Sequence, residues 1–148
     1  MDNNELVEAL KPKQVFDDDF NSLSITKTFY HEIKDLMERL HYNTTTFCYA
    51  TELNKTILSD MKKPDYKPQL RTVVTICIGL NLEYIESVEL LRKAGYILVL
   101  ARKIDYAYYL LLTKHKHPEL TMEDYNQILE GWGFDEKDFL GSQTRKKI

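Results

Sequence analysis

Apolar residues recur at helical spacing along most of the chain after residue 25. Between 26 and 40, apolar side chains stand at intervals of four, three, one and three residues, beginning at Phe29 and ending at Leu40. This spacing places them on one face of a helix. Similar patterns predict six further helices, within 44–53, 55–63, 69–80, 83–94, 102–115 and 122–131. The hydrophobic pattern therefore predicts an all-α fold.

Residues that favour helix ends stand between these segments. Asn54 is a good N-cap for helix 55–63, and Gly95 suits the end of helix 83–94. Thr121 and Asp124 resemble a capping box before helix 122–131. The apolar segment 96–100 could be a strand-like tether or the end of a helix. Within helix 83–94, the pattern predicts that Ile85, Val88, Leu91 and Ala94 face inward.

The chain divides into four parts by composition and periodicity. An acidic N-terminal arm covers 1–25, a helical domain 26–95, a helical extension 96–140 and a basic, mobile tail 141–148. The first 24 residues carry six acidic side chains and two lysines. We interpret this arm as a loose solvated tail, with a segment that docks on a partner as the alternative.

Composition narrows the function classes. The 148 residues are 43% hydrophobic with a net charge of −3, which fits a folded protein that is not a polycation. We find no leader peptide and no apolar run near the ~20 residues of a membrane span, so we expect a cytoplasmic protein that does not enter membranes. Cys48 and Cys77 lie in apolar helical patterns, and we expect both to be reduced and buried.

Motifs for enzyme chemistry are missing from the sequence. It has no glycine-rich phosphate loop, no HExxH, no paired CxxC and no nucleophile elbow. We therefore expect a protein that is not an enzyme, with no cofactor and no metal.

Two short helices joined by a tight turn, 44–53 and 55–63, form a helix-turn-helix candidate. Cys48 can be the small residue at the helix crossing, and Leu53 the apolar residue of the turn. Leu58 and Met61 can face inward. Residues at the start of the second helix would then be free to reach base edges in a major groove.

The stretch FCYATELNKTILSDMKKPDYKPQLRTVVTICIGLNL (47–82), followed by ELLRKAGY (89–96), resembles the repressor-type helix-turn-helix regulators of bacteria and phages, the XRE family. The resemblance covers 26–96, and a looser likeness continues to GWGF at 131–134. It implies a five-helix repressor-like helix-turn-helix domain, here with two further C-terminal helices. The family is usually cytosolic, often dimeric, and binds operator DNA.

The resemblance also implies which residues contact DNA. Those matching phosphate contacts are Thr44, Thr45, Lys62 and Lys63, and those matching base-facing positions are Lys55, Thr56, Ser59 and Asp60. Glu52 stands where the family usually has Gly in the turn. Double-stranded DNA is thus the expected partner of a sequence-specific transcriptional regulator, and a homodimer is a further expectation.

Charge is segregated along the chain. Residues 54–75 carry a net charge of +3 and residues 92–118 a net charge of +5, whereas 119–140 carry −6. The basic segments could neutralise a few phosphates. The acidic segments favour a second hypothesis, in which a phage or mobile-element protein uses the helix-turn-helix scaffold to regulate or inhibit a protein that itself binds nucleic acid.

Overall fold

The computed structural model describes residues 1–22 and 28–142, and every regular element within these ranges is helical. This confirms the all-α class. The elements are α1 (Asn3–Leu10), α2 (Lys13–Asn21), α3 (Phe29–Leu40), α4 (Thr44–Thr51), α5 (Ile57–Met61), α6 (Leu70–Gly79), α7 (Tyr84–Lys93), α8 (Lys103–Leu112), α9 (Met122–Gly131) and the 3₁₀ turn η2 (Glu136–Asp138). Segment 96–100 has no regular structure.

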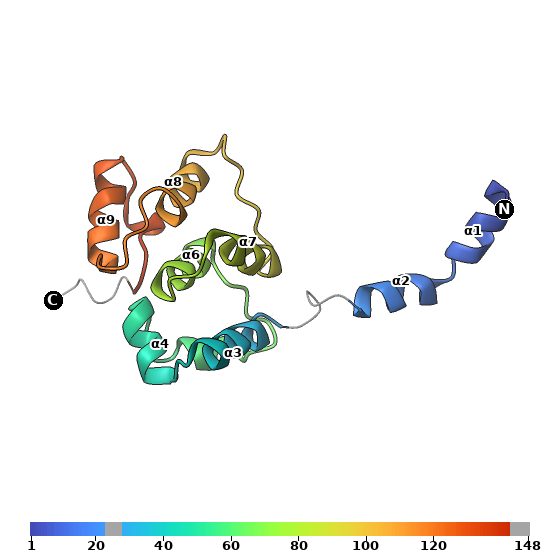
Figure 1. The fold of residues 1–148 in the computed structure, drawn as a ribbon, viewed down its shortest axis with the longest axis horizontal. Coiled ribbons are helices and arrows are strands. Elements are labelled where there is room, and N and C mark those ends of the chain that lie inside the picture. Colours follow the sequence, from blue (N-terminus) through green and yellow to red (C-terminus); the bar gives the residue numbers. More distant parts are fainter. Residues whose placement is uncertain (23–27, 143–148) are drawn as a thin grey trace.

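Helix α6 lies at the centre of the helical body and packs against α4, α7 and α8 (Figure 1). It is buried on all sides, because the six residues from Val73 to Ile78 are all inaccessible to solvent or nearly so. Its β-branched residues would also suit a strand, but a helix that is apolar all round belongs in a core. The core therefore forms around α6.

Helices α4 and α6 approach each other closely at Gly79. A Cβ atom at this position would lie 2.8 Å from the backbone oxygen of Ala50 and 2.9 Å from the Cα atom of Thr51. Both are backbone atoms, so no side-chain rotation could make room. Gly79 therefore sets the distance between α6 and the C-terminal end of α4.

Hydrogen bonds hold the last part of the C-terminal extension against its own helices α8 and α9. The side-chain amide of Asn126 donates to the carbonyl of Leu140 at 2.9 Å, and its oxygen accepts from the Leu140 N–H at 2.7 Å. The hydroxyl of Tyr108 on α8 donates to the carbonyl of Asp138 at 2.6 Å. Because buried polar groups are costly unless paired, these bonds hold 138–140 in one position between α8 and α9.

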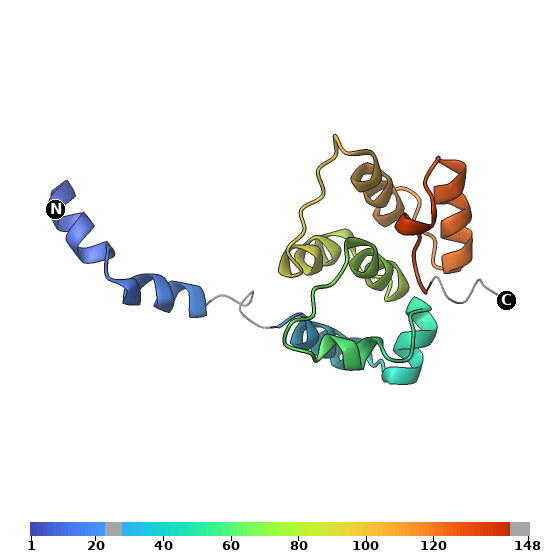
Figure 2. The same ribbon diagram turned by 180° about the vertical axis from the view of Figure 1, so that it is seen from behind.

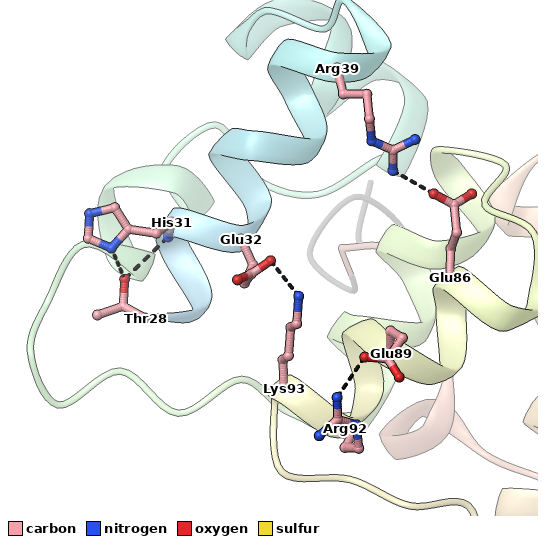
Figure 3. A network of polar contacts seen from close by, with 8 residues as sticks. All are labelled: Thr28, His31, Glu32, Arg39, Glu86, Glu89, Arg92 and Lys93. Carbon is pink, nitrogen blue, oxygen red and sulfur yellow. Dashed lines mark hydrogen bonds and ion pairs between the residues drawn. The ribbon is translucent and has the colours of Figure 1, made fainter. Parts of the chain in front are cut away.

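Two ion pairs connect α3 with α7, as Figure 3 shows. Glu32 and Lys93 are 2.9 Å apart with both side chains mostly buried, and Arg39 pairs with Glu86 nearer the surface. At its start, α3 is capped by Thr28, whose hydroxyl accepts from the backbone N–H of His31. The predicted helix start at Thr26 lies outside the described residues.

Several predicted elements differ from the structure. Helix 55–63 is shorter than predicted, because α5 contains only residues 57–61 and Asn54 does not cap it. In α7 the buried residues are Ser87, Leu90 and Leu91, which confirms the prediction for Leu91. The prediction is wrong for Ile85 and Val88, which are 72% and 38% exposed. Cys77 is buried and burial raises its pKa to about 12, but Cys48 is only half-buried.

The N-terminal arm contains two helices, α1 and α2, where we predicted a loose segment. Neither helix has a buried residue, and both lie apart from the helical body in the two opposite views (Figures 1 and 2). A side chain of Asp2 caps α1, and Pro12 precedes α2. Of the predicted mobile tail, only Gly141 and Ser142 are among the described residues.

We expect Gly79→Ala to destabilise the protein by about 1–3 kcal/mol, because the added methyl group forces α4 and α6 apart. The measurement is urea unfolding followed by helical circular dichroism. Gly131→Ala is the control, since a Cβ at this helical position meets nothing within 4 Å. The control should be neutral or stabilising. Equal stability of the two variants would contradict the close crossing.

Candidate nucleic-acid interface

Three of the predicted site residues surround one surface hollow. Thr44 and Thr45 open α4, Lys55 follows the turn, and all three line a hollow of about 600 Å³. Asn43 positions the threonines, because its side chain accepts from the Thr46 N–H at 2.8 Å and completes a capping box at the start of α4. Hydroxyl and ammonium groups of this kind are donors suited to phosphate oxygens.

The turn between α4 and α5 begins at Glu52, which adopts the left-handed conformation with φ 56°. This backbone geometry favours glycine, and an L-residue there is strained. The Glu52 carboxylate accepts a hydrogen bond from the backbone N–H of Met122 at 2.9 Å, in the first turn of α9. Its negative charge therefore faces the positive end of a helix dipole rather than the exposed side of the turn.

The C-terminal segment contacts the same turn. The backbone N–H of Ser142 donates to the carbonyl of Glu52 at 2.9 Å, and the Ser142 hydroxyl donates to the side-chain oxygen of Asn54 at 2.6 Å. The turn is thus held from α9 and from residue 142. Nothing in the sequence pattern indicates this contact, because 88 residues separate Asn54 from Ser142.

The other five predicted residues lie on or beside α5. Asp60 accepts weakly from the Thr56 hydroxyl and lies 3.4 Å from the ammonium of Lys63. The Lys62 ammonium lies 5.6 Å from the centre of the Tyr30 ring, an attractive cation–π distance. Ser59 is exposed. Thr56 precedes α5, whereas Lys62 and Lys63 follow it, so this group extends beyond a helix that is one and a half turns long.

Sequence reasoning missed two residues of the hollow as site residues, Tyr49 and Asn54. Tyr49 is 87% exposed, which is unusual for so large a ring. Its position four residues after Thr45 places both on one face of α4, and this spacing could have identified it. Cys48 also lines the hollow, where burial raises its pKa and the Lys55 ammonium acts against that rise.

A second hollow, of about 370 Å³, lies between α3 and α7. It contains the two ion pairs that join α3 to α7, which Figure 3 shows, so these charges are already paired and the hollow has a structural role. Within the described ranges, no three Cys, His, Asp or Glu side chains are grouped as metal ligands. In the same ranges no helix is long and apolar enough to cross a bilayer.

Comparison with protein-family models, with curated proteins and with solved structures finds no match to this chain.

Two substitutions of Glu52 separate the effect of its side-chain hydrogen bond from the effect of its left-handed backbone on stability. We expect Glu52→Ala to lower the free energy of unfolding by about 1 kcal/mol, because the Met122 N–H loses its acceptor while the left-handed backbone remains strained. Glu52→Gly loses the same hydrogen bond but relieves about 1 kcal/mol of backbone strain, so its stability should be near that of the unaltered protein. Urea unfolding measures both variants. An alanine variant as stable as the glycine variant would contradict this account.

Proposed function

We propose that residues 28–95 form a repressor-like helix-turn-helix domain that binds double-stranded DNA in a sequence-specific manner and regulates transcription. The observation that carries the proposal is an exposed polar surface on both sides of one left-handed turn residue. Thr44, Thr45 and Lys55 surround the hollow on α4 and the turn, and Ser59 lies on the exposed side of α5. In this proposal α4 contacts the phosphates and α5 faces the base edges.

In this proposal, one group of residues contacts phosphates and another contacts base edges. Thr44, Thr45, Lys62 and Lys63 would donate to phosphate oxygens, which orients the protein without reading sequence. Lys55, Thr56, Ser59 and Asp60 would face the bases, where lysine suits guanine and a carboxylate accepts from the cytosine amino group. Because α5 has only five residues, Lys55 and Thr56 would act from the turn rather than from the helix.

The local charges support this orientation. The Glu52 carboxylate accepts from the start of α9, whose helix dipole offsets part of its negative charge at the turn. Residues 54–75 carry five basic and two acidic side chains, a net charge of +3. A surface of this size neutralises few phosphates, and a pair of copies would double the number.

Removing two cations should weaken binding to DNA of any sequence. We expect Lys62→Ala with Lys63→Ala to reduce the slope of log K against log salt by up to about 2, because each phosphate contact contributes about 0.9. The measurement is fluorescence anisotropy on a random-sequence duplex over a salt series. Lys114→Ala with Lys137→Ala is the control, since it removes the same charge from exposed positions near α8 and η2, across α6 from α3 (Figure 1). Equal slopes for the two double variants would overturn the proposed interface.

Removal of a negative charge from the same surface should have the opposite effect on DNA affinity. We expect Asp60→Asn to strengthen binding to random duplex, because it removes a carboxylate from the face and releases Lys63 from its ion pair. Thr56→Ala should instead change the motif enriched from a random DNA pool and leave the salt slope unchanged. A loss of affinity in Asp60→Asn would contradict this arrangement.

A second candidate function is a protein-binding regulator built on the same scaffold, acting on a partner that binds nucleic acid. The observation that favours it is that Asp60 pairs with Lys63 and that Lys62 lies over Tyr30, so two cations of the face are engaged within the chain. Capture of one stoichiometric protein from native cytosol, with no binding to DNA at low salt, would support this function and exclude the first.

A further inference from the structure

A third hollow lies between α7 and segment 96–100, far in sequence from the proposed DNA face. Its volume is about 320 Å³, and its lining residues are Tyr84, Val88, Leu91, Arg92, Tyr96, Ile97, Leu98 and Leu100. Seven of these are apolar or aromatic, and Ile97 is 78% exposed. The hollow is therefore a surface with much apolar area in contact with water.

The edge of this hollow is basic. Arg92 is the charged residue in its lining and pairs with Glu89 on the exposed side of α7 at 2.7 Å. Arg102 and Lys103 follow Leu100 in the chain and are exposed, and Arg102 lies 3.6 Å from Asp105. Ion pairs of exposed arginines like these are weak, so the arginines can exchange them for carboxylates of a partner. A matching partner would combine apolar side chains with carboxylates.

The N-terminal arm has this composition. On α2, Phe16 and Phe20 are 66% and 48% exposed, and their rings stack with centroids 6.0 Å apart. On α1, Leu6 and Leu10 are also exposed. Around these apolar positions the arm carries six carboxylates against two lysines. It is thus an acidic amphipathic segment, and no residue of its helices α1 and α2 is buried.

We propose that the arm of one copy binds the α7/96–100 hollow of a second copy, with Phe16 and Phe20 against its apolar lining and the arm carboxylates near Arg92, Arg102 and Lys103. This inference concerns assembly and does not depend on DNA binding.

A second copy is the occupant that the geometry favours. Both views show the arm directed away from the body to which it belongs (Figures 1 and 2). Two copies that exchange arms form two identical contacts about a twofold axis, and exchange of an identical element is a low-cost route to a dimer. One arm of two short helices covers a small area, so duplication brings the total closer to the size of a stable interface.

The first test measures association by sedimentation velocity over a range of concentrations. The full chain should form dimers, and Phe16→Asp and Ile97→Asp should each raise the dimer dissociation constant by at least about tenfold. Ile85→Asp is the matched control, because Ile85 on α7 is 72% exposed but lines the hollow between α3 and α7 instead. It should leave the dimer intact. All three positions are exposed, and circular dichroism verifies that each variant keeps its helices.

The second test distinguishes exchange between copies from docking within one copy. With Cys48 replaced by Ser, one preparation carries Phe20→Cys and another carries Ile97→Cys; buried Cys77 is left in place. Oxidation of the mixture should give a covalent heterodimer that neither preparation forms alone. A third preparation carries both Phe20→Cys and Ile97→Cys in one chain. A monomeric full chain would overturn the proposal, as would crosslinks confined to single chains in this third preparation. A dimer that Phe16→Asp and Ile97→Asp leave unchanged would also overturn it. DNA binding enters neither test, so failure here is separate from failure of the proposed function.

Discussion

The close contact between α4 and α6 at Gly79 is the constraint on which the rest of the structure depends. Helix α6 is surrounded by α4, α7 and α8, so its position determines where each of them lies. At Gly79 the backbone of α4 comes so near that no Cβ can fit. The turn that starts at Glu52 follows directly from this contact, and so does the exposed side of α4. A single hydrogen atom in place of a side chain thus fixes the location of the proposed DNA face.

The C-terminal extension contacts the turn between α4 and α5 through hydrogen bonds. Glu52 would be a poor turn residue on backbone grounds, because it adopts a left-handed conformation that glycine adopts more easily. The hydrogen bond from Met122 gives its side chain a partner at the start of α9. Strain at the turn and stabilisation of α9 therefore arise from the same residue, which couples the extension to the turn.

Much of the fold follows from local sequence signals, and the rest depends on long-range contacts. Helical spacing and capping residues predict α9 from Met122 to Gly131 with its Thr121 cap, because these signals act within four residues. The exposure of Ile85 in α7 is not predictable in this way, since Ile85 and Leu90 are both apolar and only packing against α6 decides which is buried. The length of α5 was overestimated, because the polar residues that flank it suit a helix and a turn equally.

The site residues also differ in whether local sequence signals or only long-range contacts indicate them. The family resemblance implied Thr44, Thr45 and Lys55 as site residues, and the structure places all three in the lining of one hollow. Sequence reasoning could not identify Ser142 or the contact of Glu52 with α9, which join residues 70 to 90 positions apart. The helices of the arm also escaped prediction, since each is short and has no buried face.

The hydrogen bond between Ser142 and Asn54 has a topological consequence. It brings a position near the C-terminal end of the chain to the edge of the hollow between α4 and α5, although the two segments are distant in sequence. A label on the side chain at position 142 would lie beside the turn. Position 142 is therefore a suitable place for a local spectroscopic reporter of this surface.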